Sequence, residues 1–467
     1  MSIGWGSLPL LPLRCVLEHL STEDALVATS VCRHWRTALH MYEGRKDTLK
    51  LRVSQLDQSL FLTRLFRKFT KHLHIYIDSS ELELDEFINY VLPQFFDTKK
   101  LIEVIFIGPS YLQQNYHAPV TKIKRKITES LLYKHLYCIQ RLAFMGCELS
   151  TMISVENEKY THKHFEYYSR SLSFSSAMSP ADSVMSRCNV GLMVFSTLQH
   201  ITVDYIHIST EALETLSHLT LFKYLTLNIT RRRKMALQCI DWVRVNDFYP
   251  NGLEVSINII ALPVRKLNDV MDKVLVAGMT LTSFKVMFCK IFHGLLLTHL
   301  VDRYKSTLRE LVWVDCPYVS TDSYNKFIRV SRIDEIDRSN MNPLILLCWQ
   351  CEHLQRLVIH GYWVWQYDVL GFVRLRKTLR QLEVSSVQGG GGRRAGRLQS
   401  GAAEPVLATD LHRPVDLTFV EEVNDYTNFK WKPCQWSKLH PGLRAGSAPE
   451  QRAEYVLYEA RQTLGVT

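Results

Sequence analysis

The sequence predicts an α/β protein in two parts: a short all-helical N-terminal module, then an irregular solenoid with parallel strands on its concave face and helices on its convex face. Three observations predict this fold. Apolar residues follow helical spacing in the first forty or so residues, and short strand-like apolar runs recur from about residue 49 onward. The chain of 467 residues is also too long for one ordinary core and suits a repeat protein.

The composition is that of a soluble globular protein. Hydrophobic residues make up 46% of the chain and charged residues 22%. No stretch approaches the roughly 18 uncharged apolar residues that a membrane helix needs, and the N-terminus lacks a basic segment and a cleavage site. Eleven scattered cysteines, an odd number, do not suggest a disulfide framework. We therefore expect a cytoplasmic or nuclear protein, with no membrane partner.

The net charge of +10 raises the alternative of a nucleic-acid binder. The excess comes from short runs in predicted loops, at residues 122–126, 231–234 and 393–394. No nucleic-acid-binding motif surrounds these runs. We interpret them as solvated loop charge and expect no nucleic-acid partner. A steep salt dependence of nucleic-acid binding would favour the alternative.

The N-terminal module begins with an amphipathic helix. Its apolar positions recur at i, i+3, i+4 and i+7, and they are Leu13, Val16, Leu17 and Leu20. Pro12 fits the first turn, where its missing N–H costs nothing. A second helical stretch is predicted at residues 25–31, after a polar start. Short helices over about forty residues cannot bury a core alone, so this module needs a docking partner.

The order of these features resembles an F-box. That family reads Leu-Pro, a helix ending in leucine, an Asp turn, then Val-Cys-(Arg/Lys)-x-Trp. The matching positions here are Leu8, Pro9, Val16, Leu20, Asp24, Val31, Cys32 and Trp35. The sequence departs from the pattern at Leu11-Pro12, where an acidic residue and an aliphatic one are usual. The resemblance implies that the Skp adaptor of a cullin–RING ligase binds through the residues Leu8, Pro9, Leu13, Val16, Leu17, Leu20, Leu26, Val31, Cys32 and Trp35.

The middle of the chain carries a degenerate Leu-x-x-Leu-x-Leu pattern. Its members begin at Ile139, Leu198, Phe222, Leu281, Leu308, Leu354 and Leu379, with further strands at 253–257, 72–77 and 101–107. Several starts lie about 24 to 31 residues apart, near the leucine-rich-repeat range. Three members place a cysteine eight residues after their first apolar residue, and Cys351 lies three residues before Leu354. These cysteines are therefore predicted to be buried and unreactive, as is Cys348 one helical turn earlier.

Alternation along each strand directs the leucine positions inward and the intervening residues to the concave face. The intervening residues are mixed in charge, which favours a protein ligand over a phosphate. We expect the substrate surface to include Tyr224, Lys285, Glu310, Arg356, His360 and Glu383. The aromatic run that follows His360 is similar to that of one F-box-only subgroup, and it serves equally well as core material.

The predicted domains are an F-box at 1–42, a leucine-rich-repeat-like domain at 43–387, and a Gly-rich linker with an atypical tail at 388–467. A flexible insertion is expected near 156–189, where the sequence is rich in Ser. Four glycines at 389–392 lack the remaining residues of a phosphate-binding loop. A short terminal helix is predicted at 450–464. The sequence leaves open whether the tail supplies the terminal cap that such a solenoid needs.

No catalytic, metal-binding or dinucleotide motif occurs in the sequence, so we expect neither enzymatic activity nor a cofactor. The resemblance implies a non-catalytic substrate adaptor of a Skp–cullin–F-box ubiquitin ligase, which directs substrates to degradation. The RING subunit would then recruit the charged enzyme while this chain holds the substrate within reach. The alternative is a leucine-rich-repeat scaffold without ligase function.

Overall fold

The computed structural model describes Gly4, Asp24, Tyr111 and residues 8–20, 27–28, 30–41, 47–68, 70–79, 81–95, 101–108, 121–122, 131–148, 195–230, 237–316, 342–362, 364–388, 417–434, 438–444 and 446–462. The chain forms two compact units. Unit 1 comprises Met1–Pro109, Val120–Gln199 and Leu219–Leu221, and unit 2 comprises Ser110–Pro119, His200–His218 and Phe222–Thr467. The predicted insertion near 156–189 and the glycine run lie outside the described residues.

Unit 1 begins with helices α1 (Leu10–His19) and α3 (Arg33–Met41), which pack against each other. The predicted first helix is therefore confirmed, although it starts three residues earlier. Leu13 and Leu17 are one turn apart on α1 and fully buried. The Nε2 of His34 donates a hydrogen bond to the Leu8 carbonyl over 2.7 Å, which ties α3 to the segment before α1. The second predicted helix, at 25–31, lies mostly outside the described residues.

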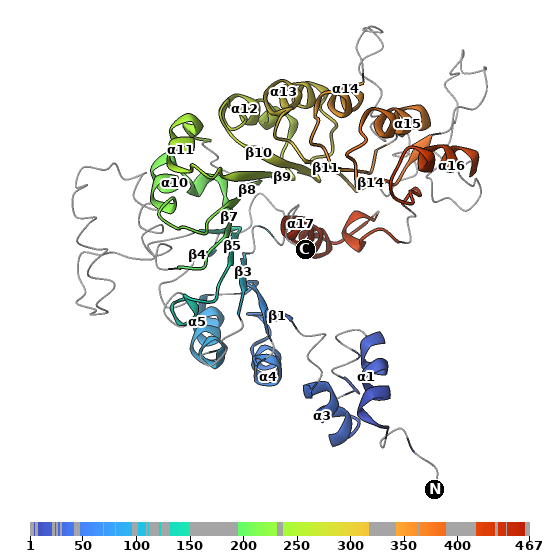
Figure 1. The fold of residues 1–467 in the computed structure, drawn as a ribbon. Coiled ribbons are helices and arrows are strands. Elements are labelled where there is room, and N and C mark those ends of the chain that lie inside the picture. The colour runs from blue at the N-terminus through green and yellow to red at the C-terminus, as the bar shows by residue number, and fades with distance from the viewer. Residues whose placement is uncertain are drawn as a thin grey trace, which may run out of the picture. The chain divides into compact units, whose positions relative to one another are not determined.

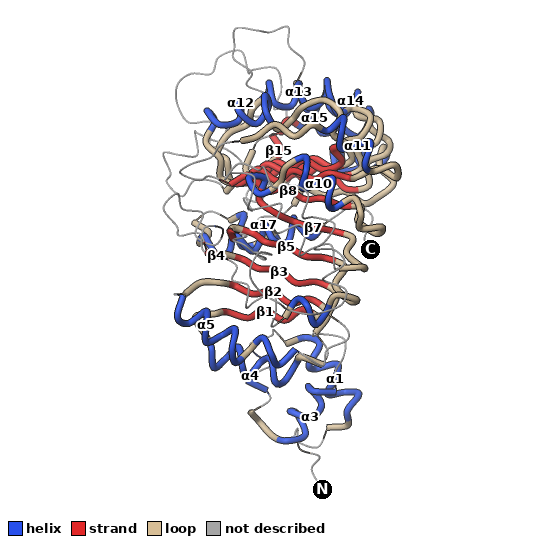
Figure 2. Tube along the Cα trace, turned by 90° about the vertical axis from the view of Figure 1, so that its left-hand side faces the viewer, coloured by secondary structure: helices blue, strands red, loops and turns tan. Residues whose placement is uncertain are grey.

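The rest of unit 1 is a run of parallel strands with helices and short 3₁₀ turns (Figure 2). In chain order these are β1 (Thr48–Arg52), α4 (Leu56–Phe66), β2 (His72–Tyr76), α5 (Glu81–Tyr90), η3 (Leu92–Phe95), β3 (Glu103–Ile107), β4 (Thr121–Lys122), η4 (Leu132–His135), β5 (Arg141–Met145) and β6 (Cys147–Glu148). Strands β1, β2, β3 and β5 pair in that order, while β4 pairs with β6. Ile75, Phe106 and Phe144 lie opposite one another in register, and the two phenylalanine rings stack at 5.4 Å. Such buried rows hold neighbouring repeats together.

Unit 2 has the same kind of construction, with more strands (Figure 1). Its paired parallel strands are β7 (His200–Asp204), β8 (Tyr224–Thr230), β9 (Glu254–Ile260), β10 (Leu281–Met287), β11 (Glu310–Val314), β12 (Arg356–His360) and β14 (Gln381–Val384). Between or beside them lie η5 (Tyr205–His207), α10 (Thr210–Leu216), α11 (Trp242–Phe248), α12 (Val264–Lys273), α13 (Gly294–Tyr304), α14 (Pro343–Gln350), β13 (Val364–Trp365), α15 (Gln366–Leu375) and β15 (Val387–Gln388). The predicted fold class, a parallel-strand solenoid after a helical module, is confirmed.

The strands of unit 2 align the leucine positions of the repeat into one buried row. From β8 to β14 this row consists of Leu227, Ile257, Phe284, Leu311, Leu357 and Leu382. All are at most 4% exposed. A register shift between Leu281 and Ser283 keeps the row continuous where β10 meets β9. Apolar side chains that meet in such a row stay out of water, which is why this spacing predicts the stacking.

Helix α16 (Leu417–Asp425) packs against α15, the last helix of the solenoid. Arg374 on α15 forms an ion pair with Glu422 at 2.5 Å. Beyond α16, the backbone N–H of Cys434 donates to the Val384 carbonyl on β14 over 2.8 Å, while Trp431 is buried. The tail therefore caps the final repeat, which the sequence left open.

The tail ends in η8 (Pro441–Leu443) and α17 (Pro449–Arg461), close to the predicted helix at 450–464. Helices α12 to α15 lie on one side of the unit 2 strands and α17 lies on the other (Figure 1). We call this second side the concave face. η8 contacts α17 closely, because a Cβ on Gly442 would lie 2.3 Å from the Gln451 carbonyl oxygen. The side chain of Gln451 accepts a hydrogen bond from the Ala448 N–H at the start of the helix.

Candidate functional site

The residues predicted to bind an adaptor differ in exposure. Leu13 and Leu17 are fully buried, whereas Pro9 and Val31 are exposed. Half-buried positions are Leu8, Val16, Leu20, Cys32 and Trp35, and Leu26 lies outside the described residues. The two buried leucines form the interior of the α1–α3 pair. Their assignment as adaptor contacts stays a prediction, as does that of the others.

Three further apolar side chains near these helices are exposed and were not among the predicted contacts. Leu11 is 74% exposed, and Leu10 and Val27 are also exposed. Exposed apolar side chains that gather on a small module are candidates for a contact with another protein. The prediction did not include them, because it followed the helix-spaced positions and the motif positions.

On the concave face of unit 2, strand register assembles a polar row. Ser283, Glu310, Arg356 and Gln381 lie opposite one another on successive strands. The hydroxyl of Ser283 and the guanidinium of Arg356 both donate to the Glu310 carboxylate, and Arg356 Nε donates to Gln381 Oε1 over 3.1 Å. Lys285 adds its ammonium 3.2 Å from Glu310. Side chains on neighbouring strands are close enough for such pairing.

Glu459 on α17 completes this group, which we call the concave cluster: Lys285, Glu310, Arg356 and Glu459. Arg356 donates to the Glu459 carboxylate through Nη1 over 2.8 Å and Nη2 over 3.0 Å. Lys285 Nζ lies 3.3 Å from Oε2 of the same group and also donates to the Glu459 carbonyl. Tyr455 donates to Oε1 over 2.9 Å. Two cations and two carboxylates balance, and all four side chains are at most 3% exposed.

Electrostatics favour the charged forms within the cluster. Burial by itself raises the pKa of Glu459. The charge of Lys285 and the hydrogen bonds from Arg356 outweigh burial and lower this pKa to about 2. Burial lowers the pKa of Arg356, yet its bonds to Glu459 and Glu310 raise it above the ordinary value. A carboxylate without these partners would be costly to bury. The cluster therefore fixes α17 on the concave face.

The other predicted substrate-surface residues, Tyr224, His360 and Glu383, are not part of the concave cluster. His360 is buried and its Nε2 lies 3.2 Å from Glu383, which is half-buried. Burial raises the pKa of Glu383, but the hydrogen bond and charge of His360 lower it below its ordinary value. Tyr224 is half-buried on β8. Thus Lys285, Glu310 and Arg356 contact or adjoin α17, and the substrate surface itself stays a prediction.

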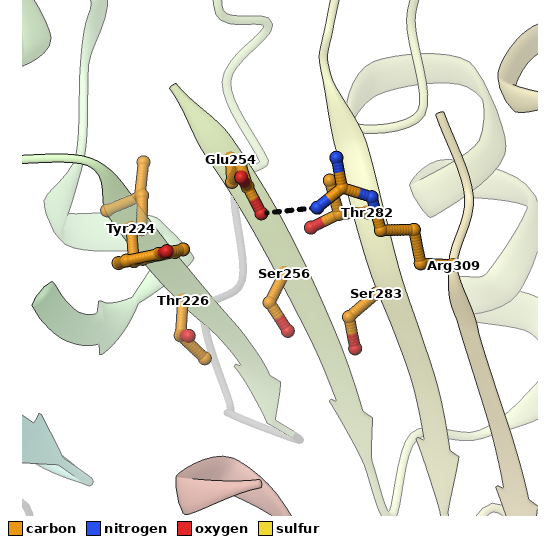
Figure 3. Close-up of a pocket in the computed structure, with 8 residues that line it drawn as sticks. Tyr224, Thr226, Glu254, Ser256, Thr282, Ser283 and Arg309 are labelled. Carbon is orange, nitrogen blue, oxygen red and sulfur yellow. Dashed lines mark hydrogen bonds and ion pairs between the residues drawn. The ribbon is translucent and has the colours of Figure 1, made fainter. Parts of the chain in front are cut away.

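Tyr224 borders a polar hollow on the concave face (Figure 3). Its lining residues are Tyr224, Leu225, Thr226, Glu254, Ser256, Thr282, Ser283 and Arg309. Arg309 forms an ion pair with Glu254 at 3.2 Å across the strands. The volume open to a water molecule is about 20 Å³, far below that of a small-molecule site. The hollow is thus too small to hold a small molecule, and Ser283 joins it to the concave cluster.

Sequence reasoning missed Glu459, the residue that completes the cluster. Arg356 and Glu459 are 103 positions apart, and Lys285 and Glu459 are 174 apart. A single glutamate on an expected terminal helix carries no signal of such long-range partners. Glu254 and Arg309 were also missed: Glu254 lies opposite Tyr224 on a strand whose concave residues were not selected, and Arg309 immediately precedes β11.

Four of the five cysteines that the repeat pattern predicts to be buried are buried in the structure. Cys147, Cys289, Cys348 and Cys351 are buried, and burial raises the pKa of Cys289 and Cys351 to about 12. Cys316 is half-buried, and its thiol donates to the Gly442 carbonyl over 3.0 Å, which attaches η8 to the end of β11. Burial raises its pKa to about 11. Thiols that stay protonated at neutral pH are poor nucleophiles, as the repeat pattern predicts.

The described residues hold neither a metal-binding group of side chains nor a membrane-spanning helix. No group of three or more His, Cys, Asp and Glu side chains there could hold a metal ion. Within the same residues, no helix is long and apolar enough to span a membrane.

Residues 5–46 match the F-box domain family. The chain is 45% identical to human (Homo sapiens) F-box only protein 33 over 53 residues, which is 11% of this chain and 10% of that protein. For the Mus musculus protein of the same name the identity is 43% over 53 residues, 11% of this chain and 9% of that protein. The chain thus covers about a tenth of these relatives.

Solved structures give weaker matches. A crystal structure of a TLR13–ssRNA13 complex aligns with 69% of this chain and 43% of that chain, at 11% identity and a TM-score of 0.28. An internalin, inlF of Listeria monocytogenes, aligns with 82% of this chain and 89% of that one, at 11% identity and a TM-score of 0.22. TM-scores this low support no argument about this chain. The matched family, together with the α1–α3 pair, places an F-box domain at residues 5–46 of this chain.

Proposed function

We propose that this chain is the substrate-recognition subunit of a Skp–cullin–F-box ubiquitin ligase. The F-box domain carries the proposal, because F-box proteins in general act through Skp-type adaptors. In this assignment the chain is not catalytic. It brings a protein substrate near the ubiquitin-charged enzyme that the RING subunit recruits, and cullin links the two.

The exposed apolar residues of the F-box support an adaptor contact. Val31 is 66% exposed, and Leu11 and Val27 are exposed as well. Burying such side chains against an adaptor removes apolar area from water, which stabilises the complex by roughly 1.5–3 kcal/mol per large side chain. The buried Leu13 and Leu17 then act indirectly, by holding α1 against α3.

The strand face of unit 2 supports the substrate-binding part of the proposal. It carries polar and charged side chains of both signs, those of the concave cluster being covered by α17, and a hollow that admits only about one water molecule. Such a surface suits a protein ligand rather than a small molecule. The proposed place of action is the cytoplasm, the nucleus or both.

A pull-down with purified Skp adaptor tests the proposal. Wild-type chain should bind, and Val31→Glu should weaken binding at least tenfold, since the new charge would be buried at the interface. Leu82→Glu is the matched control, because Leu82 is an exposed apolar residue, 74% exposed, on α5 outside the F-box. Folded wild-type chain that does not bind the adaptor would overturn the ligase assignment and leave a repeat scaffold.

A further inference from the structure

The carboxylate of Glu459 is held as a bound ligand would be. Both terminal nitrogens of Arg356 donate to it, Lys285 contacts it, and the Tyr455 hydroxyl donates to it. A two-point contact between guanidinium and carboxylate gives direction as well as strength. The strands supply the receiving cations from one side, and α17 supplies a single acidic group from the other.

The receiving side is organised without α17. Strand register alone puts Arg356 opposite Glu310 and Gln381, and hydrogen bonds to both fix the orientation of the guanidinium. Lys285 enters from β10, next to Glu310. Lys285 and Arg356 together with Glu310 carry one net positive charge. A positive site built on adjacent strands requires one carboxylate to balance it once water is excluded.

The shape of the site fits a helix. Along α17, the side chains of Ala453, Tyr455, Val456, Leu457, Glu459 and Ala460 are buried, whereas Glu450, Gln451 and Tyr458 are exposed. The Tyr455 ring meets Phe288, at the end of β10, with centroids 6.1 Å apart. The face therefore accepts a one-sided helix with apolar residues around one central acidic group. Helix-in-groove recognition uses this arrangement.

We propose that the concave face of unit 2 is a binding site for an acidic amphipathic helix of a partner protein, and that α17 is its intramolecular occupant. The partner places a glutamate or aspartate between Lys285 and Arg356 and displaces α17. This inference rests on the proposed function, because the partner would be the ligase substrate. An attached helix competes at a high effective concentration, so weak ligands are rejected.

Full-length chain and a fluorescent peptide of residues 447–462 test the proposal by anisotropy. Wild-type chain should bind the peptide only weakly, because α17 occupies the site. In the Glu459→Lys chain, α17 cannot pack on the concave face, because three cations would face Glu310. This chain should therefore bind the peptide at least tenfold more tightly than wild type. The peptide with Glu459→Gln should bind that chain about 10- to 100-fold more weakly, because it lacks the charge-assisted bonds.

Glu450→Lys is the matched control chain, since it reverses a charge at an exposed position of the same helix and should behave as wild type. Glu459→Gln is a second variant chain, which weakens the contact of α17 with the concave face less than Glu459→Lys does. It should bind the peptide with intermediate affinity. Circular dichroism and thermal unfolding follow the fold of each. The proposal fails if both Glu459 chains are folded but ignore the peptide, or if the two peptides bind equally. Unfolding of both chains also overturns it, because a displaceable helix must leave a folded receptor.

Adaptor pull-down on the same chains separates this inference from the proposed function. Glu459→Lys should retain adaptor binding, because the F-box is unchanged. Peptide binding without adaptor binding would support the helix site and remove the ligase assignment. Adaptor binding without peptide binding would leave the ligase assignment in place and mark α17 as a permanent part of unit 2.

Discussion

The F-box and the concave face of unit 2 distribute their side chains in opposite ways. The F-box leaves apolar Leu11 and Val31 in water, whereas the concave face buries Arg356 and Glu310 at 3% and 0% exposure. Both arrangements cost free energy unless another surface compensates. On the concave face that surface is α17, from the same chain. At the F-box, Leu11 and Val31 stay exposed, and the proposed adaptor would cover them.

The contrast indicates how each surface responds to mutation. A residue that already makes its contacts within the chain contributes to folding stability. A residue whose contact lies in another protein contributes to binding and little to stability. Substitutions at the two surfaces should therefore separate in unfolding and binding measurements, and four predictions test that separation.

The largest effect is expected for Arg356→Met. It leaves the buried Glu310 and Glu459 carboxylates with Lys285 as the one cation of the concave cluster, so the free energy of unfolding should fall by about 3–5 kcal/mol. Denaturant unfolding measures this. Arg374→Met is the control, because Arg374 and Glu422 pair at 2.5 Å with side chains 49% and 44% exposed, and such pairs contribute at most about 1 kcal/mol. Equal losses of unfolding free energy in the two variants would show that burial of the ion pair does not determine its contribution to stability.

Leu17→Ala should destabilise the F-box alone. The side chain is fully buried between α1 and α3, and truncating a buried leucine costs about 2–5 kcal/mol. Hydrogen exchange should show faster opening of α1 and α3, with unchanged protection of α17. Val31→Ala, at an exposed position, should change stability by no more than about 0.5 kcal/mol. Matching losses at the two positions would mean that the F-box has no distinct interior.

Acid should weaken the packing of α17 on the concave face. The pKa of Glu459 is about 2, below the ordinary value of 4.5, because Lys285 and Arg356 outweigh the effect of burial. A depressed carboxyl pKa stabilises the fold above pH 4.5, and this stabilisation is lost as pH falls toward 2. The stability difference between wild type and Glu459→Gln should therefore shrink over that range. The stability difference between wild type and Glu450→Gln, at an exposed position, should stay near zero. A difference for Glu459→Gln that does not change with pH would contradict the lowered pKa of Glu459.

The smallest stability effect is expected at the polar hollow. Arg309→Ala removes an ion pair with Glu254 whose side chains are 40% and 16% exposed, so it should cost at most about 1 kcal/mol. Thermal unfolding measures this loss. Lys223→Ala, which removes the other cation near Glu254, 3.4 Å away, is the matched comparison. A loss of several kcal/mol would show that the hollow is part of the folded core and not a contact surface.

The sequence predicted the local elements well because they depend on local rules. Helical spacing at Leu13 and Leu17 gave a buried face, and strand alternation placed Leu311 and Leu357 in the buried row of unit 2. Turn lengths and residue identities within each repeat are sufficient for this. The F-box was predicted from its resemblance to a known family, which the order of short motifs within forty or so residues carries. The α16 cap was not predicted, because its contact with α15 joins segments that no periodicity links.

The tertiary structure alone decided what covers the concave face. The sequence placed Lys285, Glu310 and Arg356 there by alternation, and the same alternation predicted them to be available. Their burial depends on Glu459, which lies 103 positions beyond Arg356 on a helix that packs against the face opposite α12–α15. Alternation specifies which face a strand residue points to, whereas coverage depends on long-range packing of a distant segment. A buried charge is tolerated only where its partner arrives, and that partner is set by the fold.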